Sequence, residues 1–590
     1  MAWYDEAIFY HIYPLGLAGA PEHNPYAQPV PRLREIFPWI AHVKEIGCNA
    51  IYIGPLFESE GHGYETTDYK KLDGRLGTNE DLKEFVKLSH EQGIRVIFDG
   101  VFNHTGRNFF AMRDVREKRE QSPYRDWYQN VNFWGNNEFN DGFSYDNWGG
   151  YNIMAKLNQK NPAVRDFICD VIRFWVSEFD VDGIRLDAAD VLDFEFMKAL
   201  RRTANEVKPE FWLMGEVIHG DYTRWVNEGT LHSVTNYHLH KALYSGHNEH
   251  NYFEIAHTVK RLYAMGGNRP DGLKLYNFVD NHDVERIHTK LWNKAHYLPV
   301  HVLLYALPGI PSVYYGSEFG IEGKKTYGTD APLRPKLNLA DFGDCVAENP
   351  CTKLIAALGR IHKEHPALSY GDYQELVLTN RQYAFARSGC GECVYVAVNN
   401  DDNGATIRIP VREGGTYLGL LTGNRMDAAD GWIEVRLPGC SGDVIALEVA
   451  CVNGAEPVDF TAVKETPCEE ELSEAVNETP CEEELSETVK VTSSEKELPA
   501  EGKDESCAAS ETTSEVACAG KVIPLRERKT GFVDKAASEG KAYECMTIEE
   551  LQEAILSKME KNGPVTEQML RSVWENNHQG SLLNWVRSFR

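Results

Sequence analysis

The chain of 590 residues has room for two to four domains, and its 42% hydrophobic content is ordinary for a globular protein. A net charge of -28 argues against a nucleic-acid or anionic-membrane partner and allows a neutral one. No run of about 18 apolar residues occurs, no basic and apolar leader opens the chain, and the 13 cysteines form no disulfide framework, so we expect a cytoplasmic protein without a membrane span.

A repeated strand-then-helix pattern runs from residue 7 to about residue 368. Apolar β-rich runs predict eight strands, at 7–13, at 50–53, and near Val96, Ile184, Trp212, Val234, Leu275 and Val313. Amphipathic runs predict intervening helices such as 37–46, 80–91, 164–179 and 352–364, with Thr78 or Asn79 as the cap of the second. Eight strands that alternate with helices are typical of a (β/α)₈ barrel, whose active site lies at the carboxyl ends of the strands.

Four of these strand segments end in acidic or amide residues: 95–104, 183–190, 211–216 and 275–283. In the second, side chains alternate between faces, so Arg185 and Asp187 point the same way. A charged pair that faces inward is costly unless its groups neutralise each other or perform chemistry. One such pair alone would more often be structural. Because three other segments repeat the layout, we favour chemistry.

In this order, the four segments resemble the four signature regions of the α-amylase superfamily, glycoside hydrolase family 13. The resemblance covers roughly residues 3–450. It implies a TIM barrel over 1–104 and 157–368, a B domain inserted after the third strand at 105–156, and an antiparallel β-sandwich C domain at 369–451. The residues agree, because the insertion is too long for an ordinary loop and the last segment shows short alternating runs broken by Asn and Gly turns.

The resemblance also assigns catalytic roles. Retention needs two carboxyl groups about 5 to 5.5 Å apart, and the family pattern makes Asp187 the nucleophile and Glu216 the acid/base, with Asp283 as the third carboxylate. Arg185, which the pattern places among the substrate-binding residues, shares a face with Asp187, so we expect it to keep the pKa of Asp187 low. Glu216 has no cation beside it in the sequence and is expected to hold its proton in a drier setting.

Further residues follow from the same pattern. Tyr64 matches the aromatic ring that stacks under the sugar, and His104 and His282 match histidines that hold it. Asp99 matches a carboxylate that supports the site and touches the arginine. Alone, each tyrosine or histidine would more often be a core residue. Asn103 contributes to a calcium site in many relatives, but the subfamily suggested below often lacks that site, so we expect no required cofactor and leave calcium open.

The resemblance implies a retaining hydrolase of α-1,4-glucosidic bonds in maltooligosaccharides and maltodextrins, with cyclodextrins as a further candidate. The segment 154–158 resembles a motif of cyclomaltodextrinases and neopullulanases, with Ala155 in place of proline. Ala188 after the nucleophile favours α-1,4 cleavage, whereas Ile218 stands where those relatives usually carry tryptophan. The alternatives are a 4-α-glucanotransferase, an oligo-1,6-glucosidase, and a non-catalytic barrel that serves as a binding subunit.

The composition changes after Val452. Residues 464–476 recur almost unchanged as residues 477–489, and the polar, charged stretch 452–542 is expected to be a disordered acidic linker with a 13-residue repeat. At 543–590 a capping box and apolar stripes predict a small helical module. We expect it to dock another protein, and a self-contained mini-domain and a starch-binding module are the competing interpretations.

Overall fold

The computed structural model describes residues 2–266, 273–326, 329–448, 551–552 and 555–556. The chain divides into two units, Met1–Thr479 and Pro480–Arg590, and the fold below is that of the first. The predicted acidic linker lies outside the described residues, as does nearly all of the predicted helical module. Within the described residues, no helix is long and apolar enough to cross a membrane.

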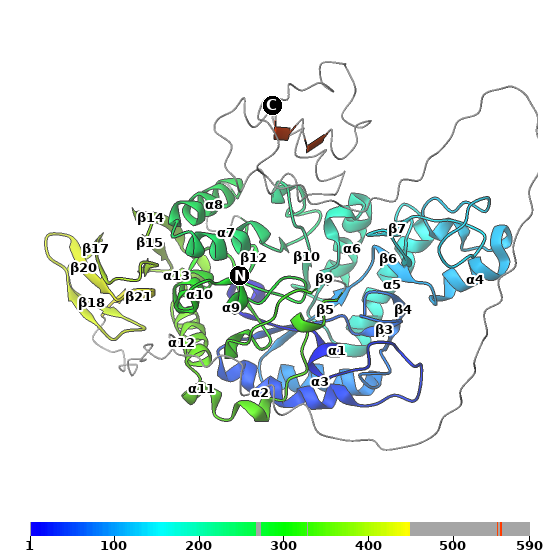
Figure 1. Ribbon diagram of the computed structural model, residues 1–590, viewed down its shortest axis with the longest axis horizontal. Helices are drawn as coiled ribbons and strands as arrows, with labels where there is room; N and C mark the ends of the chain where they lie inside the picture. The colour runs from blue at the N-terminus through cyan, green and yellow to red at the C-terminus, as the bar shows by residue number, and fades with distance from the viewer. Residues whose placement is uncertain (1, 267–272, 327–328, 449–550, 553–554, 557–590) are drawn as a thin grey trace, which may run out of the picture. The chain divides into compact units, whose positions relative to one another are not determined.

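Eight parallel strands form the centre of the first unit (Figure 1). Their bounds are β1 (Phe9–Ile12), β2 (Ala50–Ile53), β5 (Arg95–Gly100), β9 (Gly183–Leu186), β10 (Trp212–Gly215), β11 (Ser233–Val234), β12 (Tyr276–Phe278) and β13 (Ile310–Tyr314). They pair in the order β11, β10, β9, β5, β2, β1, β13, β12. The N–H of Asn236 donates to the C=O of Tyr276 at 2.9 Å, where β11 and β12 meet. The predicted eight-stranded barrel is therefore confirmed.

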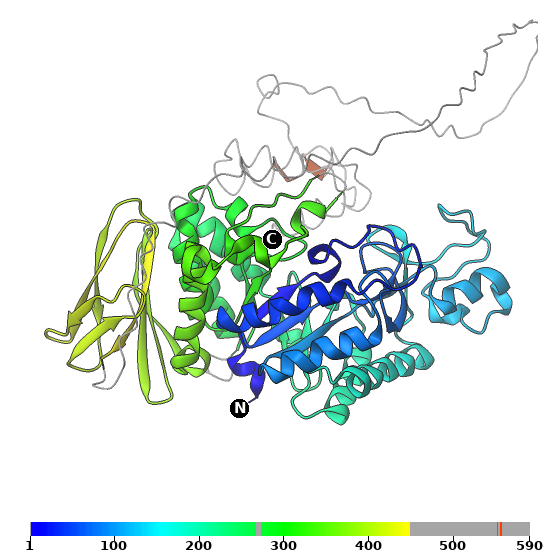
Figure 2. The ribbon, with the colours of Figure 1, turned by 90° about the horizontal axis from the view of Figure 1, so that it is seen from below.

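Helices surround this barrel (Figure 2). The long ones are α2 (Phe37–Glu45), α3 (Asn79–Glu91), α5 (Pro162–Phe179), α6 (Phe194–Val207), α7 (Tyr237–Asn248), α8 (Tyr252–Met265), α10 (Tyr297–Ala306) and α12 (Pro350–Glu364). Single turns are α1 (Pro14–Leu17), α9 (Ile287–Lys290), α11 (Cys345–Glu348) and α13 (Ala367–Tyr370). The predicted cap of α3 is confirmed, because Thr78 and Asp81 form a capping box at its start.

Aromatic side chains fill the barrel toward the amino ends of its strands. Phe9, Trp212 and Tyr276 are the first residues of their strands, and all three are buried. The rings of Phe9 and Trp212 stack with centroids 5.0 Å apart. Because this end is packed with apolar groups, the inward polar side chains lie nearer the carboxyl ends of the strands, where (β/α)₈-barrel enzymes carry their active sites.

Residues 105–156 fold largely into a separate segment after β5 (Figure 1, cyan). It contains α4 (Phe110–Lys118) and a three-stranded sheet in the order β6 (His104–Gly106), β8 (Tyr151–Lys156), β7 (Asn147–Trp148). A second small pair, β3 (Phe57–Ser59) with β4 (Thr66–Leu72), follows β2. Lys156 pairs with His104, which ties the end of the insertion to the carboxyl end of the barrel.

The C-terminal part of the unit is antiparallel. A six-stranded sheet has the order β14 (Asp372–Leu378), β15 (Gln382–Gly389), β16 (Glu392–Asn399), β21 (Ser441–Leu447), β18 (Thr416–Gly419), β19 (Arg425–Asp427). It is accompanied by the pair β17 (Ala405–Pro410) and β20 (Trp432–Leu437). The buried Arg387 of β15 donates to the C=O of Ala306 in α10 at 2.7 Å. The predicted fold class is confirmed, whereas the exact domain boundaries stay predictions.

Candidate active site

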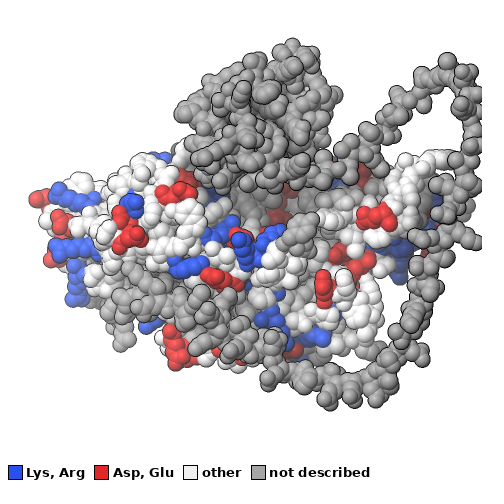
Figure 3. All heavy atoms as spheres, in the orientation of Figure 1, with Lys and Arg blue, Asp and Glu red and all other residues white. Residues whose placement is uncertain are grey.

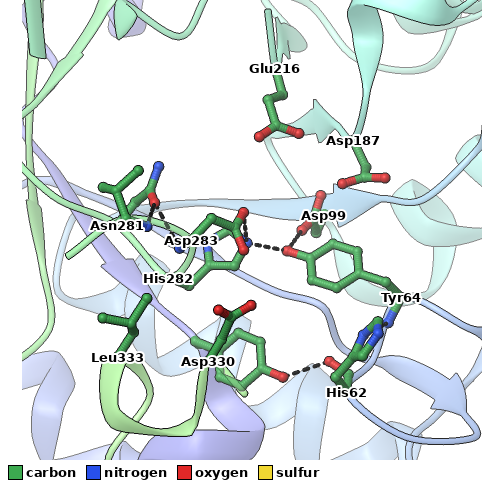
Figure 4. Close-up of polar contacts among 12 residues, drawn as sticks. His62, Tyr64, Asp99, Asp187, Glu216, Asn281, His282, Asp283, Asp330 and Leu333 are labelled. Carbon is green, nitrogen blue, oxygen red and sulfur yellow. Dashed lines mark hydrogen bonds and ion pairs between the residues drawn. The ribbon is translucent and has the colours of Figure 1, made fainter. Parts of the chain in front are cut away.

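A cleft of about 400 Å³ opens at the carboxyl ends of the barrel strands. Five of the predicted residues line it, and His282, Arg185 and Asp99 lie directly against them. Figure 4 shows the carboxylates of Asp187, Glu216 and Asp283 turned toward one space. The lining residues are His62, Tyr64, His104, Trp148, Met154, Asp187, Ala188, Asp190, Glu216, Ile218, Tyr237, Asp283, Val284, Lys325, Asp330 and Arg334.

One arginine links three carboxylates beneath the cleft. Arg185 Nη1 lies 2.9 Å from Asp99 Oδ1 and 3.1 Å from Asp187 Oδ1. Its Nη2 lies 2.8 Å from Glu216 Oε2. The register of β5 and β9 produces this arrangement, because Asp99 and Arg185 are direct cross-strand partners whose side chains both face inward. Glu216 has no cation beside it in the sequence, but its position directly after β10 brings it to the same guanidinium.

Glu216 also accepts hydrogen bonds from two other groups. The backbone N–H of Ala188 donates to Glu216 Oε2 at 3.2 Å, and the Tyr237 hydroxyl donates to Oε1 at 3.2 Å. Ala188 adopts the left-handed conformation, with φ 47° and ψ 42°, which is uncommon for a residue with a side chain. This turn directly after Asp187 aims the Ala188 N–H at Glu216, so local backbone strain serves the site.

The pKa of Asp187 departs from the expectation. Burial raises it well above the usual range of an aspartate, Arg185 opposes the shift, and the negative charges of Glu216 and Asp99 add to it. The predicted low pKa of Asp187 is therefore wrong for the free cleft. The reason is the number of neighbours, because one guanidinium is shared among three carboxylates and cannot offset the desolvation of each.

Asp283 lies in the opposite electrostatic situation. Burial alone raises its pKa, but His282, Arg334 and Arg185 together hold that pKa below the usual range of an aspartate. Arg334 Nη2 donates to Asp283 Oδ1 at 2.9 Å, and His282 Nε2 lies 2.9 Å from Oδ2. The N–H of Asp283 donates to Asn281 Oδ1 at 2.8 Å. Asp283 is thus a fixed negative charge on the cleft wall.

Tyr64 and the two predicted histidines form one wall of the cleft. The Tyr64 hydroxyl donates to Asp99 Oδ2 at 3.1 Å and lies against His282 Nε2 (Figure 4), and the Tyr64 and His282 rings are nearly parallel. His104 Nε2 lies 3.1 Å from the C=O of Tyr64, and burial lowers the pKa of His104 to about 3, so its ring is neutral. Trp148, from the insertion, lies parallel to the His104 ring.

Asn103 does not have the surroundings that calcium prefers. Its Nδ2 lies 3.2 Å from His104 Nδ1, and its Oδ1 accepts from Gln159 Nε2 at 3.3 Å. Calcium sites are built mainly from carboxylate and carbonyl oxygens. Among the described residues, no group of three His, Cys, Asp or Glu side chains is arranged to hold a metal ion. This donor set does not fit calcium, and no step below depends on a metal.

Sequence reasoning missed several residues of the site. Tyr52, whose hydroxyl donates to Asp99 Oδ2 at 2.9 Å, could have been found from strand alternation, because it is an inward residue of β2. Tyr237 begins α7, and nothing in its local sequence points to Glu216. Arg334 lies in an irregular segment 51 residues beyond Asp283, so no periodic pattern places it.

Comparison with known proteins decides the family. Residues 32–367 match the family described as "Alpha amylase, catalytic domain". The chain belongs to the α-amylase family. This α-amylase family member is 30% identical to a cyclomaltodextrinase of Bacillus sp over 433 residues, 69% of this chain and 75% of the relative. It is 29% identical to the intracellular maltogenic amylase of Bacillus subtilis over 342 residues, 55% of this chain and 57% of that one.

A solved structure supports the same family assignment. A cyclomaltodextrinase structure aligns with a TM-score of 0.66 at 26% identity, covering 75% of this α-amylase family chain and 78% of the other. The family resemblance stated from four short strand ends is therefore confirmed.

Proposed function

We propose that the chain is a retaining hydrolase of α-1,4-glucosidic bonds in maltooligosaccharides and maltodextrins, with cyclodextrins as a further candidate substrate. The observation that carries the proposal is the meeting of Asp187, Glu216 and Asp283 in one cleft, with Arg185 bonded to the first two. Sharing one guanidinium keeps two carboxylates close, as retention requires. The names of the relatives, cyclomaltodextrinase and maltogenic amylase, agree with this substrate class.

The reaction takes two displacements. In the first, a carboxylate oxygen of Asp187 bonds to the anomeric carbon while the glucosidic C–O bond breaks, and the proton of Glu216 goes to the leaving oxygen. In the second, water attacks the same carbon and gives its proton to Glu216, and the bond to Asp187 breaks. Each step reverses the configuration once, so the product keeps the α configuration.

The two carboxyl groups need one proton between them, and it must sit on Glu216. The raised pKa of Asp187 means that its carboxyl group keeps a proton in the free cleft to higher pH than a solvated aspartate would. In the free cleft Glu216 faces only donors, from Arg185, Ala188 and Tyr237. We therefore expect the sugar to separate Glu216 from Arg185 on binding. The arginine then favours ionised Asp187, and Glu216 carries the proton.

Asp283 stabilises the positive charge that develops on the sugar. Its low pKa keeps it ionised throughout the reaction, and its bonds to Arg334 and His282 fix its position before the sugar arrives. Preorganised charge of this kind contributes most to catalysis because it needs no rearrangement in the transition state. The ring of Tyr64 offers an apolar face for the sugar, and neutral His104, whose two ring nitrogens contact the C=O of Tyr64 and the amide of Asn103, holds this wall in place.

Three alternatives stay open to test. Transfer to another sugar uses the same covalent intermediate, and α-1,6 cleavage uses the same carboxylates. A non-catalytic binding subunit has no need of three convergent carboxylates, so we place it last. Incubation with maltotriose, a cyclodextrin, pullulan and isomaltose, followed by product identification, separates them. Glucose and maltose from maltotriose support hydrolysis, longer products indicate transfer, and cleavage of isomaltose alone would overturn the α-1,4 assignment.

We also propose a cytoplasmic location, in keeping with the relative named as intracellular and with the cysteine pattern.

Residues 543–590 stay a predicted docking module for another protein. Truncation after Val452 is expected to leave the rate on maltotriose within about twofold, because an acidic linker has no apolar pattern that could pack on the barrel. A loss of activity on truncation would contradict this separation of roles.

A further inference from the structure

A groove of about 540 Å³ lies in the C-terminal sandwich, outside the catalytic cleft, and it is larger than that cleft. It runs between β19, the last strand of the six-stranded sheet, and β20 of the two-stranded pair. Within the part of the chain that the structure describes, neither strand pairs with a further strand on that side, so the groove lies at an edge of the sandwich. Its lining residues are Arg408, Asn424, Arg425, Met426, Asp427, Ala429, Trp432, Glu434, Val435, Arg436 and Asp443.

Strand β20 presents an aromatic ring, a carboxylate and a guanidinium in a row. Trp432, Glu434 and Arg436 occupy alternate positions and are exposed, while the residues between them are buried. Side chains two residues apart on a strand stand about 7 Å from each other. Trp432 is 38% exposed, and the guanidinium of Arg408 lies over its ring at 5.1 Å. The ring is thus held in place with part of its surface free.

The charges of the groove favour a neutral ligand. Three arginines, Arg408, Arg425 and Arg436, stand with the exposed acids Asp427 and Glu434, and Arg425 is paired with Glu448 at 2.6 Å, so the formal charges sum to zero. In Figure 3 the sandwich, at the left, carries blue and red side chains close together and no large patch of one sign. A phosphate or nucleic-acid ligand would need an excess of positive charge.

The same side chains suit sugar hydroxyls. Carboxylates accept hydrogen bonds in pairs and guanidinium groups donate them in pairs, which matches two neighbouring hydroxyls of a pyranose. An exposed indole offers a flat apolar surface for the C–H face of the ring. A protein partner would need a larger apolar area, and the large apolar side chains here are few, chiefly Trp432 and Met426.

We propose that this groove is an accessory site that binds an α-glucan chain and tethers polymeric substrate to the enzyme. The inference rests on the proposed function, because a polymer of repeating glucose units can occupy the groove and the cleft at once. Binding at one site raises the effective concentration of chain at the other. A substrate too short to occupy both sites gains nothing from the groove.

Electrophoresis of the full-length protein in native gels that contain glycogen measures binding as retardation. We expect Trp432→Ala to weaken glycogen binding by about tenfold, Trp432→Phe to keep most of it because a ring remains, and Arg436→Gln to weaken it through a different contact. Trp292→Ala is the matched control, because Trp292 is 72% exposed and lies outside the groove. All four variants should hydrolyse maltotriose at the wild-type rate, while KM for glycogen rises in Trp432→Ala and Arg436→Gln and stays near the wild-type value in Trp432→Phe and Trp292→Ala.

Equal retardation of wild type and Trp432→Ala would overturn the accessory site, as would a wild type that hydrolyses maltotriose but is not retarded. If the groove residues only stabilise the fold, Trp432→Ala should have a lower thermal stability. Trp432→Phe and Arg436→Gln should then bind glycogen equally well, and this result also refutes the proposal. Failure of the proposed function gives a different result: no hydrolysis of any α-glucan, with retardation still lost in Trp432→Ala.

Discussion

Replacing Glu216 with glutamine is expected to lower the pKa of Asp187 in the free cleft, where the charge of Glu216 raises it, and so to move the acidic limb of kcat/KM for the first chemical step to lower pH. Asp187 must be ionised to attack, so this step is lost as pH falls through the pKa of Asp187. Burial raises that pKa, and the charge of Glu216 raises it further while Arg185 opposes both. The wild-type limb should therefore lie above the ordinary aspartate value of about 3.9.

The contacts of Arg185 set the scale of the shift. Asp187 and Glu216 bond to its two terminal nitrogens at 3.1 and 2.8 Å, and their side chains are only 10% and 15% exposed. Unit charges about 5 Å apart, the separation of retaining enzymes, repel by roughly 3 kcal/mol at an effective dielectric constant near 20. That repulsion corresponds to about two pH units. Because solvent reaches the cleft, we expect a downward shift of about one to two units.

The assay is the pH dependence of kcat/KM for fluoride release in the first turnover of an α-maltosyl fluoride, because kcat/KM reports the pKa values of the free cleft. This leaving group needs little protonation, so the variant without a proton donor still performs the first step. Asp190→Asn is the matched control. Asp190 lines the same cleft, and burial raises its pKa, but its charge is not among the main influences on Asp187. Its acidic limb should coincide with that of the wild type.

Two results would refute this reasoning. If the limb of Glu216→Gln stays in place or moves to higher pH, Glu216 does not raise the pKa of Asp187. If the wild-type limb lies at or below about pH 4, the nucleophile is not the buried, shared carboxylate that the site contains.

Three further outcomes are expected. Asp187→Asn and Glu216→Gln should each lower the turnover of maltotriose by a factor of about 10³ or more. Both variants should keep the far-ultraviolet circular dichroism spectrum of the folded protein. Near-normal activity of Asp187→Asn would show that the nucleophile is another residue. Proton NMR at early times should show the α-anomer as the first product, whereas initial β-anomer would exclude double displacement. Gly54→Ala should destabilise the protein by about 1–3 kcal/mol in thermal unfolding, because the new methyl carbon would lie 2.3 Å from Asp99 Cβ. Gly414→Ala is the control, because a methyl carbon there would have no atom within 4 Å. Equal stability of the two variants would contradict the packing at Gly54.

Local sequence determined the barrel and the frame of its site. Apolar runs of strand length that alternate with amphipathic helices leave few other folds, and each of the eight expected strands is present. Alternation along β9 was enough to put Arg185 and Asp187 on one face. The short strands β18 and β19 escaped notice because three or four residues carry too little periodicity to be recognised.

The electrostatics of the site were decided by tertiary structure. Strand pairing places Asp99 and Glu216 on the same guanidinium as Asp187, and this sharing raises the pKa that local reasoning expected to be low. Tyr237 and Arg334 reach the carboxylates from 21 and 51 residues away. A sequence specifies which face of a strand a side chain occupies, because that depends on the backbone alone. The charge state depends on every group packed around the side chain, and only the folded chain brings those groups together.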